Sequence, residues 1–144
     1  MKLSTKCRYG TRAMIEIARH YTEGPVKRRE ISKSQKISPA YLENILIALR
    51  THNLIRTIRG AGGGFTLDTT PENITMIQIV QALEGSLAPV DCIDRSDVCD
   101  RSEFCASRQL WQDLYKAQTE ILKKTTLQTL LDREDWLMRT DYCI

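Results

Sequence analysis

Apolar residues recur at intervals of three and four along much of this chain, which is the spacing of helices with one buried face. Between Ser4 and Tyr21 the apolar side chains fall mainly on one side of such a helix. Gly24-Pro25 interrupts the pattern, and a short helix is predicted from Lys27 to Ser34 with Ile31 as its core contact. The first 36 residues therefore predict two helices that share a core.

A third helix is predicted after the turn at residues 36–37. Ser38 is a favoured N-cap, and Pro39 suits the first helical position because its missing N–H would have no partner there. The apolar positions 42, 45, 46 and 49 should face the core, and the helix should end near residues 51–53. Its outward side chains are expected to be Tyr41, Glu43, Asn44 and Arg50.

Two short strands, residues 54–59 and 65–67, flank a glycine-rich loop that is free to adopt positive φ angles. The order helix, short helix, turn, helix and hairpin is that of a winged helix-turn-helix domain. The predicted fold class is therefore mainly α, with a two-stranded wing.

The second half of the chain predicts two more helices. Thr75 and Gln78 have the spacing of a capping box, and Gly85 stands where a C-terminal glycine belongs. Residues 86–106 show no clear period and are expected to form a loop. A long helix is predicted over 107–131, and a lone helix could not hide its apolar face from water, so that face must pack against something. Residues 132–144 are expected to be a short tail.

The charge of the 144-residue chain is unevenly distributed. Residues 1–70 hold 13 Lys and Arg against 5 Asp and Glu, whereas residues 71–144 hold 8 against 13. A basic front half suggests a polyanionic partner. No apolar run approaches the ~18 residues of a membrane helix, and no signal pattern opens the chain. We therefore expect a cytoplasmic protein with no membrane partner.

The basic residues lie on the elements that a winged helix turns toward a DNA duplex. The third helix would enter the major groove by its N-terminal end, where Ser38, Ala40, Tyr41, Glu43 and Asn44 would read bases. Lys27 and Arg28 would contact phosphates, and Arg59 at the wing tip would enter the minor groove. Double-stranded DNA is therefore the predicted partner.

Three of the five cysteines, Cys92, Cys99 and Cys105, fall within 14 residues of the predicted loop. They contain no C-x-x-C pair, which disfavours zinc ribbons and thioredoxin-like motifs. Three thiolates on a loop can still converge on a soft metal or an iron–sulfur cluster. The alternative is three unrelated cysteines. No Ser/His/Asp set and no paired acids on a rigid element are present, so the chain is not predicted to be an enzyme.

Several motifs together resemble the IscR-type bacterial regulators, a family that includes the CymR, NsrR and RirA groups. The resemblance spans about residues 1–131. It rests on the opening residues 1–10, on the segment from Ile37 to Glu43, on the wing from Ile58 to Phe65, and on the three loop cysteines. It implies a homodimeric winged-helix transcription factor whose long C-terminal helix pairs with its counterpart. With its three cysteines the chain resembles the cluster-binding branch of the family.

Two residues depart from the family's cluster-binding pattern. IscR proteins carry a histidine ligand three residues after the last cysteine, and this chain has Arg108 there, which cannot ligate because a guanidinium stays protonated. NsrR-like members use an acidic residue of the other subunit at position eight, where this chain has Arg8. Cys7 is the leading candidate for a fourth ligand, although it is equally compatible with a small core residue. The other candidates are an acidic residue of the loop, Ser107, His20, His52 and an open iron site.

The sequence is therefore interpreted as a dimeric DNA-binding regulator that senses iron–sulfur cluster status, with a [2Fe-2S] cluster preferred over [4Fe-4S]. Its expected organisation is a winged helix-turn-helix domain (1–85), a cluster-binding loop (86–106), a dimerisation helix (107–131) and a tail (132–144). One alternative is a regulator that uses the same thiols directly as a redox switch. A second is a cluster-carrying electron-transfer protein.

Overall fold

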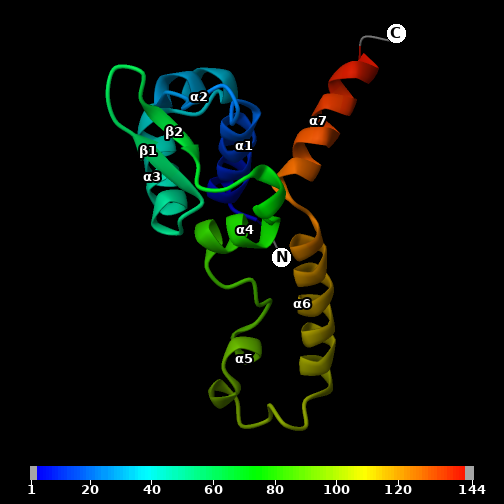
Figure 1. Ribbon diagram of the computed structural model, residues 1–144. Helices are drawn as coiled ribbons and strands as arrows, with labels where there is room; N and C mark the ends of the chain where they lie inside the picture. The colour runs from blue at the N-terminus through cyan, green and yellow to red at the C-terminus, as the bar shows by residue number, and fades with distance from the viewer. Residues whose placement is uncertain (1–2, 142–144) are drawn as a thin grey trace.

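The computed structural model describes residues 3–141 and has the predicted winged-helix order (Figure 1). The first half of the chain contains α1 (Thr5–Arg19), α2 (Arg28–Gln35), α3 (Pro39–Thr51), the hairpin β1 (Ile55–Ile58) and β2 (Gly64–Leu67), a 3-10 turn η1 (Pro71–Asn73) and α4 (Met76–Glu84). The second half contains α5 (Asp91–Asp94), η2 (Ser96–Val98), α6 (Ala106–Lys124) and α7 (Leu127–Asp141).

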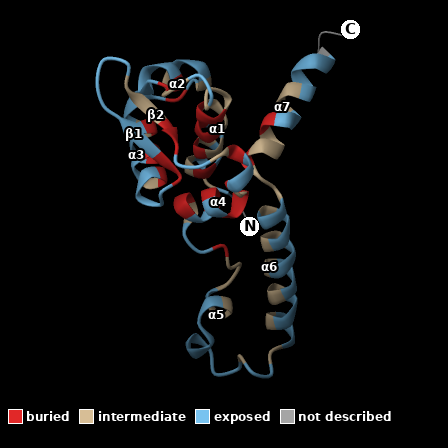
Figure 2. Ribbon diagram, viewed as in Figure 1, coloured by how far each residue is buried: buried red, intermediate tan, exposed pale blue. Residues whose placement is uncertain are grey.

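The core lies between α1, α2, α3 and α4, whose buried faces turn toward one another (Figure 2). Ser4 begins α1 by accepting a hydrogen bond from the Cys7 backbone N–H at 3.1 Å. The backbone N–H and the hydroxyl of Ser4 also donate to Glu84 Oε1 at 2.9 and 2.5 Å, which ties the start of α1 to the end of α4. Gly10 allows these two helices to approach closely, since a Cβ at that position would lie 2.3 Å from Leu83 Cδ1.

The wing is attached to the chain just before α2. β1 and β2 pair antiparallel from Ile55↔Leu67 to Ile58↔Gly64, and Val26 forms an isolated bridge with Phe65 on the other edge of β2. Its two backbone hydrogen bonds with Phe65 are both 2.8 Å long. Gly64 is required at this crossing because a Cβ would lie 2.4 Å from the Val26 carbonyl oxygen. The hairpin is thereby fixed beside the N-terminus of α2.

Residues 86–106 were expected to be an irregular loop, but they contain two short helical turns, α5 and η2, and α6 already begins at Ala106. This segment runs away from α4 and crosses to the start of α6, which returns toward α4 (Figure 1). α5 contacts α6 along the way. We refer to residues 91–105 as the cysteine loop. It lies at the end of α6 that is far from the winged-helix domain.

The single helix predicted over 107–131 is wrong, because the chain leaves the helical path at Thr125 and Thr126. Thr125 has extended backbone angles, and its carbonyl oxygen accepts a hydrogen bond from the Met76 N–H at 2.8 Å. Leu127 N–H donates to the Ile74 carbonyl oxygen, also at 2.8 Å, and Thr126 bridges Thr75. β-branched residues favour extended backbone. Pairing with residues 74–76 therefore replaces the helical hydrogen bonds and separates α6 from α7.

The predicted tail from residue 132 is also wrong within the described residues, since it is helical as far as Asp141. The first turns of α7 pack on α1, with Leu127 and Leu131 buried in the core. Arg19 of α1 forms ion pairs with Glu134 at 2.6 Å and Asp135 at 2.9 Å. Cys143 lies outside the described residues. None of the helices within residues 3–141 has the length and apolar composition needed to cross a membrane.

The α6–α7 break makes Leu127 a core residue, and this is testable. Leu127 is 0% exposed, so Leu127→Ala should lower the free energy of unfolding by about 2–5 kcal/mol through lost burial and the cavity left behind. Leu137 on the same helix is 56% exposed, and Leu137→Ala should change the free energy of unfolding by less than about 0.5 kcal/mol. Urea unfolding of both variants measures the difference. Equal effects would contradict the docking of α7.

Candidate nucleic-acid interface and cysteine loop

The turn between α2 and α3 is held rigidly by local contacts. Lys36 adopts a left-handed conformation with φ of 53°, and the Ile37 N–H donates to the Ser32 carbonyl oxygen at 3.1 Å. The Ser32 hydroxyl donates in turn to the Ile37 carbonyl oxygen at 2.6 Å, and the Ile37 side chain is buried. These contacts set the angle between the two helices. Ser38 then caps α3 through a 3.4 Å hydrogen bond from the Tyr41 N–H.

Most predicted base-reading residues are exposed at the N-terminal part of α3. Ser38, Ala40, Glu43 and Asn44 all lie on the surface. Tyr41 was expected to point outwards, but it is half-buried, with its ring edge-on to Tyr9 of α1 at a centroid distance of 6.0 Å. The Arg12 guanidinium lies 5.5 Å from the centre of the Tyr9 ring. The N-terminal end of α3 thus packs through Tyr41 against one aromatic ring of α1, Tyr9, which in turn contacts the Arg12 guanidinium.

The predicted phosphate and minor-groove contacts surround the same region. Lys27 and Arg28 are exposed at the start of α2, next to the bridge between Val26 and the wing. Arg59 is exposed where β1 ends and the wing loop begins, and Gly60 follows it with a φ of 107°. The wing loop extends beside α2 (Figure 1). The geometry therefore gathers the predicted cations around the helix-turn-helix unit.

An ion pair between Arg28 and Glu43 was not foreseen from the sequence. Arg28 Nη1 contacts Glu43 Oε2, and both side chains remain about half exposed. At the predicted DNA-facing position the Glu43 carboxylate would repel phosphates, and the Arg28 guanidinium beside it would offset that negative charge. The two residues are 15 positions apart, and only the fixed angle between α2 and α3 brings them together.

The three loop cysteines occupy separate structural positions. Cys92 lies in the single turn of α5, Cys99 follows η2, and Cys105 is the N-cap of α6. Cys99 is exposed, whereas Cys92 and Cys105 are partly exposed. Over residues 3–141, no three His, Cys, Asp or Glu side chains are gathered closely enough to hold a metal ion. The thiols are accessible and chemically suited to iron–sulfur ligation, but they do not converge in this arrangement.

Arg108, at the position of the family's histidine ligand, connects the two ends of the cysteine loop. Its Nε donates to the Cys92 carbonyl oxygen at 3.0 Å, and its Nη1 is 3.5 Å from the Ser102 carbonyl oxygen. The guanidinium thus holds backbone near two of the cysteines instead of ligating a metal.

The thiols of Cys105 and Cys7 differ in acidity. The Ser107 hydroxyl lies 3.1 Å from the Cys105 sulfur and, together with the Arg108 backbone N–H, lowers the pKa of Cys105. Cys7 is 1% exposed on the buried face of α1. Burial, together with the nearby Glu84 carboxylate, raises the pKa of Cys7 to about 11. The candidate fourth ligand is therefore placed as a protonated core thiol.

Comparison with known proteins identifies the relatives of this chain. The family model described as "Rrf2: Iron-dependent Transcriptional regulator" matches residues 3–133. The HTH-type transcriptional regulator CymR of Bacillus subtilis is 38% identical over 135 residues, covering 94% of this chain and 93% of the relative. The HTH-type transcriptional regulator IscR of Pectobacterium atrosepticum is 34% identical over 141 residues, covering 98% of this chain and 85% of the relative.

Solved structures agree with the same assignment. The structure of CymR, titled the global cysteine regulator of B. subtilis, matches with a TM-score of 0.78 at 37% identity, covering 92% of this chain and 98% of that one. The structure of T. potens IscR matches with a TM-score of 0.77 at 34% identity, covering 93% of this chain and 88% of that one. The matched family model extends from residue 3 through the winged-helix domain and α6 into the first turns of α7.

The acidity of the two thiols predicts their reactivity in metal-free protein. Only the thiolate is alkylated, so a lowered pKa moves the midpoint of the pH–rate profile of Cys105 below the ordinary value of 9.0. Cys7 should stay unmodified wherever the protein is folded. Iodoacetamide labelling followed by peptide mass spectrometry measures both. Ser107→Ala removes the main cause and should shift the Cys105 profile to higher pH, and an unchanged profile would contradict this account.

Proposed function

The chain belongs to the Rrf2 family of transcriptional regulators, and we propose that it binds a two-fold symmetric DNA operator as a homodimer whose affinity depends on the state of its cysteine loop. The carrying observation is the position of that loop. It opens α6, the helix whose other end is joined to the winged-helix domain through residues 74–76 and 125–127. The loop and the DNA-reading helix thus belong to one connected set of elements.

DNA contact follows from the geometry of the helix-turn-helix unit. The N-terminal end of α3 would lie in the major groove and place Ser38, Ala40 and Asn44 at base edges. Lys27 and Arg28 would contact the phosphates, and Arg59 would enter the minor groove, where the potential is most negative. Tyr41 would present the part of its ring that Tyr9 leaves uncovered, and Glu43, partly neutralised by Arg28, would discriminate between sites.

The dimer is supported by an apolar stripe on α6. Leu110, Leu114 and Ile121 are all exposed, and with Ala117 they follow the 4-3-4 spacing of a coiled-coil seam. Within the part of the chain that the structure describes, 40–66% of each of the three large side chains of this stripe is left exposed. A second α6 would cover it, so the proposed dimerisation element is α6 (106–124) rather than the predicted 107–131 helix.

The cysteine loop is proposed to hold an iron–sulfur cluster, with [2Fe-2S] favoured. Cys92, Cys99 and Cys105 would hold it, and the resemblance to the cluster-binding branch supports this set. When bound, the cluster would supply redox and ligand-loss chemistry sensitive to oxidants, nitric oxide or iron supply. Cys7 is not proposed as a ligand because it is buried in the core, and Arg108 is not because it holds the backbone of the loop. The fourth ligand is not assigned.

A change in the cysteine loop would reach α3 through helices that pack against one another. Cys105 begins α6, α6 packs on α4, and α4 packs on the recognition helix α3. Arg108 in the first turn of α6 also donates a hydrogen bond to the carbonyl oxygen of Cys92. A change in the order of the loop would therefore bias the position of α3, which is a linkage between two sites.

The test is anaerobic purification with a visible spectrum, counts of iron and sulfide per chain, and operator binding at several salt concentrations. We expect a coloured protein whose log K falls by ~0.9 per neutralised phosphate as log salt rises. A colourless protein whose DNA binding responds to oxidants would instead establish thiol sensing. A coloured protein without salt-sensitive DNA binding would establish electron transfer.

Each loop cysteine should be required for the cluster. Cys92→Ala, Cys99→Ala and Cys105→Ala should each abolish stable colour while leaving a folded dimer, because each removes a thiolate. Cys7→Ala is the matched control and should keep iron and sulfide at wild-type levels if Cys7 is a core residue. Full retention of the cluster in any loop variant would refute the assignment.

Arg59 should contribute to site discrimination. Arg59→Ala should weaken binding to the preferred operator by ~1–3 kcal/mol and affect random duplex less, since it would remove a side chain that reads groove width. Fluorescence anisotropy with both duplexes measures this. Equal losses of affinity for the operator and for random duplex would show that Arg59 contacts a phosphate and does not read the groove.

The α6 stripe should hold the dimer. Leu114→Asp would place a charge in an apolar seam and should produce monomers at concentrations where the wild type is dimeric. Analytical ultracentrifugation gives the mass, and circular dichroism checks the fold. Asp113 is an exposed neighbour off the stripe, and Asp113→Asn should leave the mass unchanged. An intact Leu114→Asp dimer would place the interface elsewhere.

A further inference from the structure

Ile47 is an exposed apolar side chain in the middle of the recognition helix. It is 46% exposed, and within α2 and α3, all of whose residues the structure describes, it is the one exposed large apolar side chain. Ile45 and Leu49, two residues to either side, are buried in the core. Two residues rotate about 200° around a helix, so Ile47 lies on the opposite face. That face also carries Ala40 and Asn44, which are predicted to read bases.

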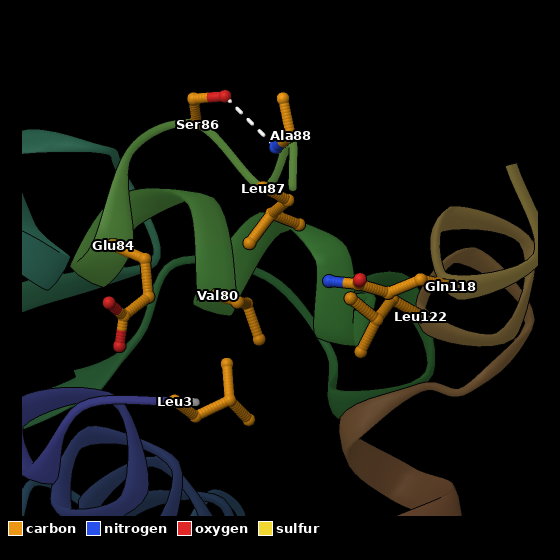
Figure 3. Close-up of a pocket in the computed structure, with 8 residues that line it drawn as sticks. All are labelled: Leu3, Val80, Glu84, Ser86, Leu87, Ala88, Gln118 and Leu122. Atoms are coloured by element: carbon orange, nitrogen blue, oxygen red, sulfur yellow. Dashed lines mark hydrogen bonds between the residues drawn. The ribbon is translucent and has the colours of Figure 1, made fainter. Parts of the chain in front are cut away.

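The surroundings of Ile47 differ from those of the other exposed apolar residues. Leu3 lines an apolar groove of about 360 Å³ between α4 and α6, which Val80 and Leu122 also line (Figure 3). The exposed apolar residues of α6 belong to the proposed dimer seam. Ile47 instead has exposed polar side chains beside it on α3, namely Glu43 and Asn44 one turn before it and Arg50 and Thr51 one turn after it.

Two of the polar groups beside Ile47 already have partners. The Glu43 carboxylate pairs with the Arg28 guanidinium, and the Thr51 hydroxyl donates to the Ile47 carbonyl oxygen at 2.9 Å. β-branched side chains in helices are held close to one χ1 rotamer, so the methyl groups of Ile47 point in a fixed direction. Straight-chain polar residues stabilise an exposed helix position better than isoleucine does. Position 47 therefore presents a rigid apolar surface that the stability of α3 does not require.

The position of Ile47 along α3 keeps it within the major groove when α3 docks as proposed. Ala40 and Ile47 are seven residues apart, or about 10.5 Å along the helix, and the major groove of B-DNA is about 12 Å wide. Asn44 precedes Ile47 by about 4.5 Å, which is between one and two base-pair steps of about 3.4 Å. A helix that brings Asn44 to a base edge therefore brings Ile47 to a base within two pairs of it.

Cations border Ile47 on the side of the wing. Arg28 and Arg50, both exposed, line a hollow of about 120 Å³ together with Ile47 and Phe65. Glu43 also lines it, and its pairing with Arg28 leaves the charge of Arg50 in excess. An apolar side chain bordered by net positive charge fits a surface with an apolar floor and anionic edges. The major groove is such a surface where thymine methyl groups lie between the two phosphate backbones.

We propose that Ile47 contacts the C5-methyl group of a thymine in the major groove, which makes it a specificity-determining residue of the DNA interface. The inference rests on the proposed operator binding. Among the four bases only thymine carries this methyl group, and it is displayed in the major groove. Burying it against Ile47 distinguishes thymine from cytosine without a hydrogen bond. The contact adds to the hydrogen bonds of Asn44, since an asparagine amide favours adenine, and both select A·T pairs.

Replacing thymine by uracil in the DNA isolates this contact, because uracil keeps the base pairing and the O4 acceptor and lacks only the methyl group. The probe is a duplex that the full-length, anaerobically purified protein selects from a randomised pool. Each thymine is replaced in turn, at the equivalent position of both half-sites, and fluorescence anisotropy gives the affinity. We expect a position where uracil weakens wild-type binding at least about tenfold, since each lost methyl contact weakens it about fourfold.

Ile47→Ala should make binding insensitive to uracil at that position. The variant should bind the thymine duplex at least about tenfold more weakly than the wild type, and uracil should then weaken its binding less than about twofold, because the methyl group has lost its partner. Thermal unfolding checks that the fold is intact, as expected for an exposed side chain.

Ile58→Ala is the matched control. Ile58 is an isoleucine of the wing with 39% exposure, and the wing is predicted to enter the minor groove, where no methyl group is displayed. The loss of affinity that uracil causes should therefore be the same at every position for Ile58→Ala and the wild type. A loss that disappears in Ile58→Ala as well would overturn the assignment to Ile47.

The outcomes separate this inference from the proposed function. Selection of no duplex, or binding that does not weaken with salt, would overturn operator binding and this inference with it. A selected duplex that tolerates uracil at every position would overturn only the thymine contact. An equal loss with uracil in wild type and Ile47→Ala would place the methyl contact on another residue. Unchanged affinity of Ile47→Ala for every duplex would assign Ile47 to a different partner, such as a protein surface, and would also overturn the proposal.

Discussion

The short backbone pairing between residues 74–76 and 125–127 is the contact on which the arrangement of the two halves depends. Two hydrogen bonds of 2.8 Å, from Met76 N–H to Thr125 O and from Leu127 N–H to Ile74 O, stop α6 and start α7 in a new direction. They fix α6 against α4 and insert Leu127 into the winged-helix core. Without this pairing a continuous helix would carry α7 away from α1 and leave Arg19 without its acidic partners.

Local signals in the sequence were sufficient for the DNA-binding domain. The caps at Ser38 and Thr75 and the glycine at position 85 act within a few residues of themselves, so they could be interpreted without tertiary information. The break at Thr125 could not, since its cause is a strand-like contact 50 residues away. The Arg28–Glu43 pair and the ring contact between Tyr41 and Tyr9 were missed for the same reason.

The cysteine loop shows the same division. The spacing of Cys92, Cys99 and Cys105 identified the candidate site, but the sequence could not show that the three thiols stand apart in this structure. For Cys7 the sequence suggested a ligand where the structure has a core residue. Its position on the first helix made it a candidate ligand, and only packing against α4 reveals a buried thiol with a raised pKa.

α1 is the element that joins these features, because it contacts α2, α3, α4 and α7. Its Arg12 donates to Gln35 Oε1 at 3.1 Å, and Gln35 Nε2 donates to Glu16 Oε2 at 2.8 Å, which fixes the end of α2 on α1. Tyr9, between Arg12 and Tyr41, extends the same network to the start of the recognition helix. A displacement of α1 would therefore be transmitted to both helices of the helix-turn-helix unit, α2 and α3, at once.

Arg108 limits which part of the cysteine loop is free to change. A guanidinium stays charged over the whole physiological range and cannot ligate a metal, so its hold on the Cys92 carbonyl does not depend on the state of the thiols. Cys105 is likewise fixed at the start of α6. The segment between these two anchors, which contains Cys99, is the part whose order can respond to chemistry at the sulfurs. Phe104, the most exposed apolar side chain of the loop, lies directly beside the Cys105 anchor, so the largest movement is expected nearer Cys99, in the middle of the segment.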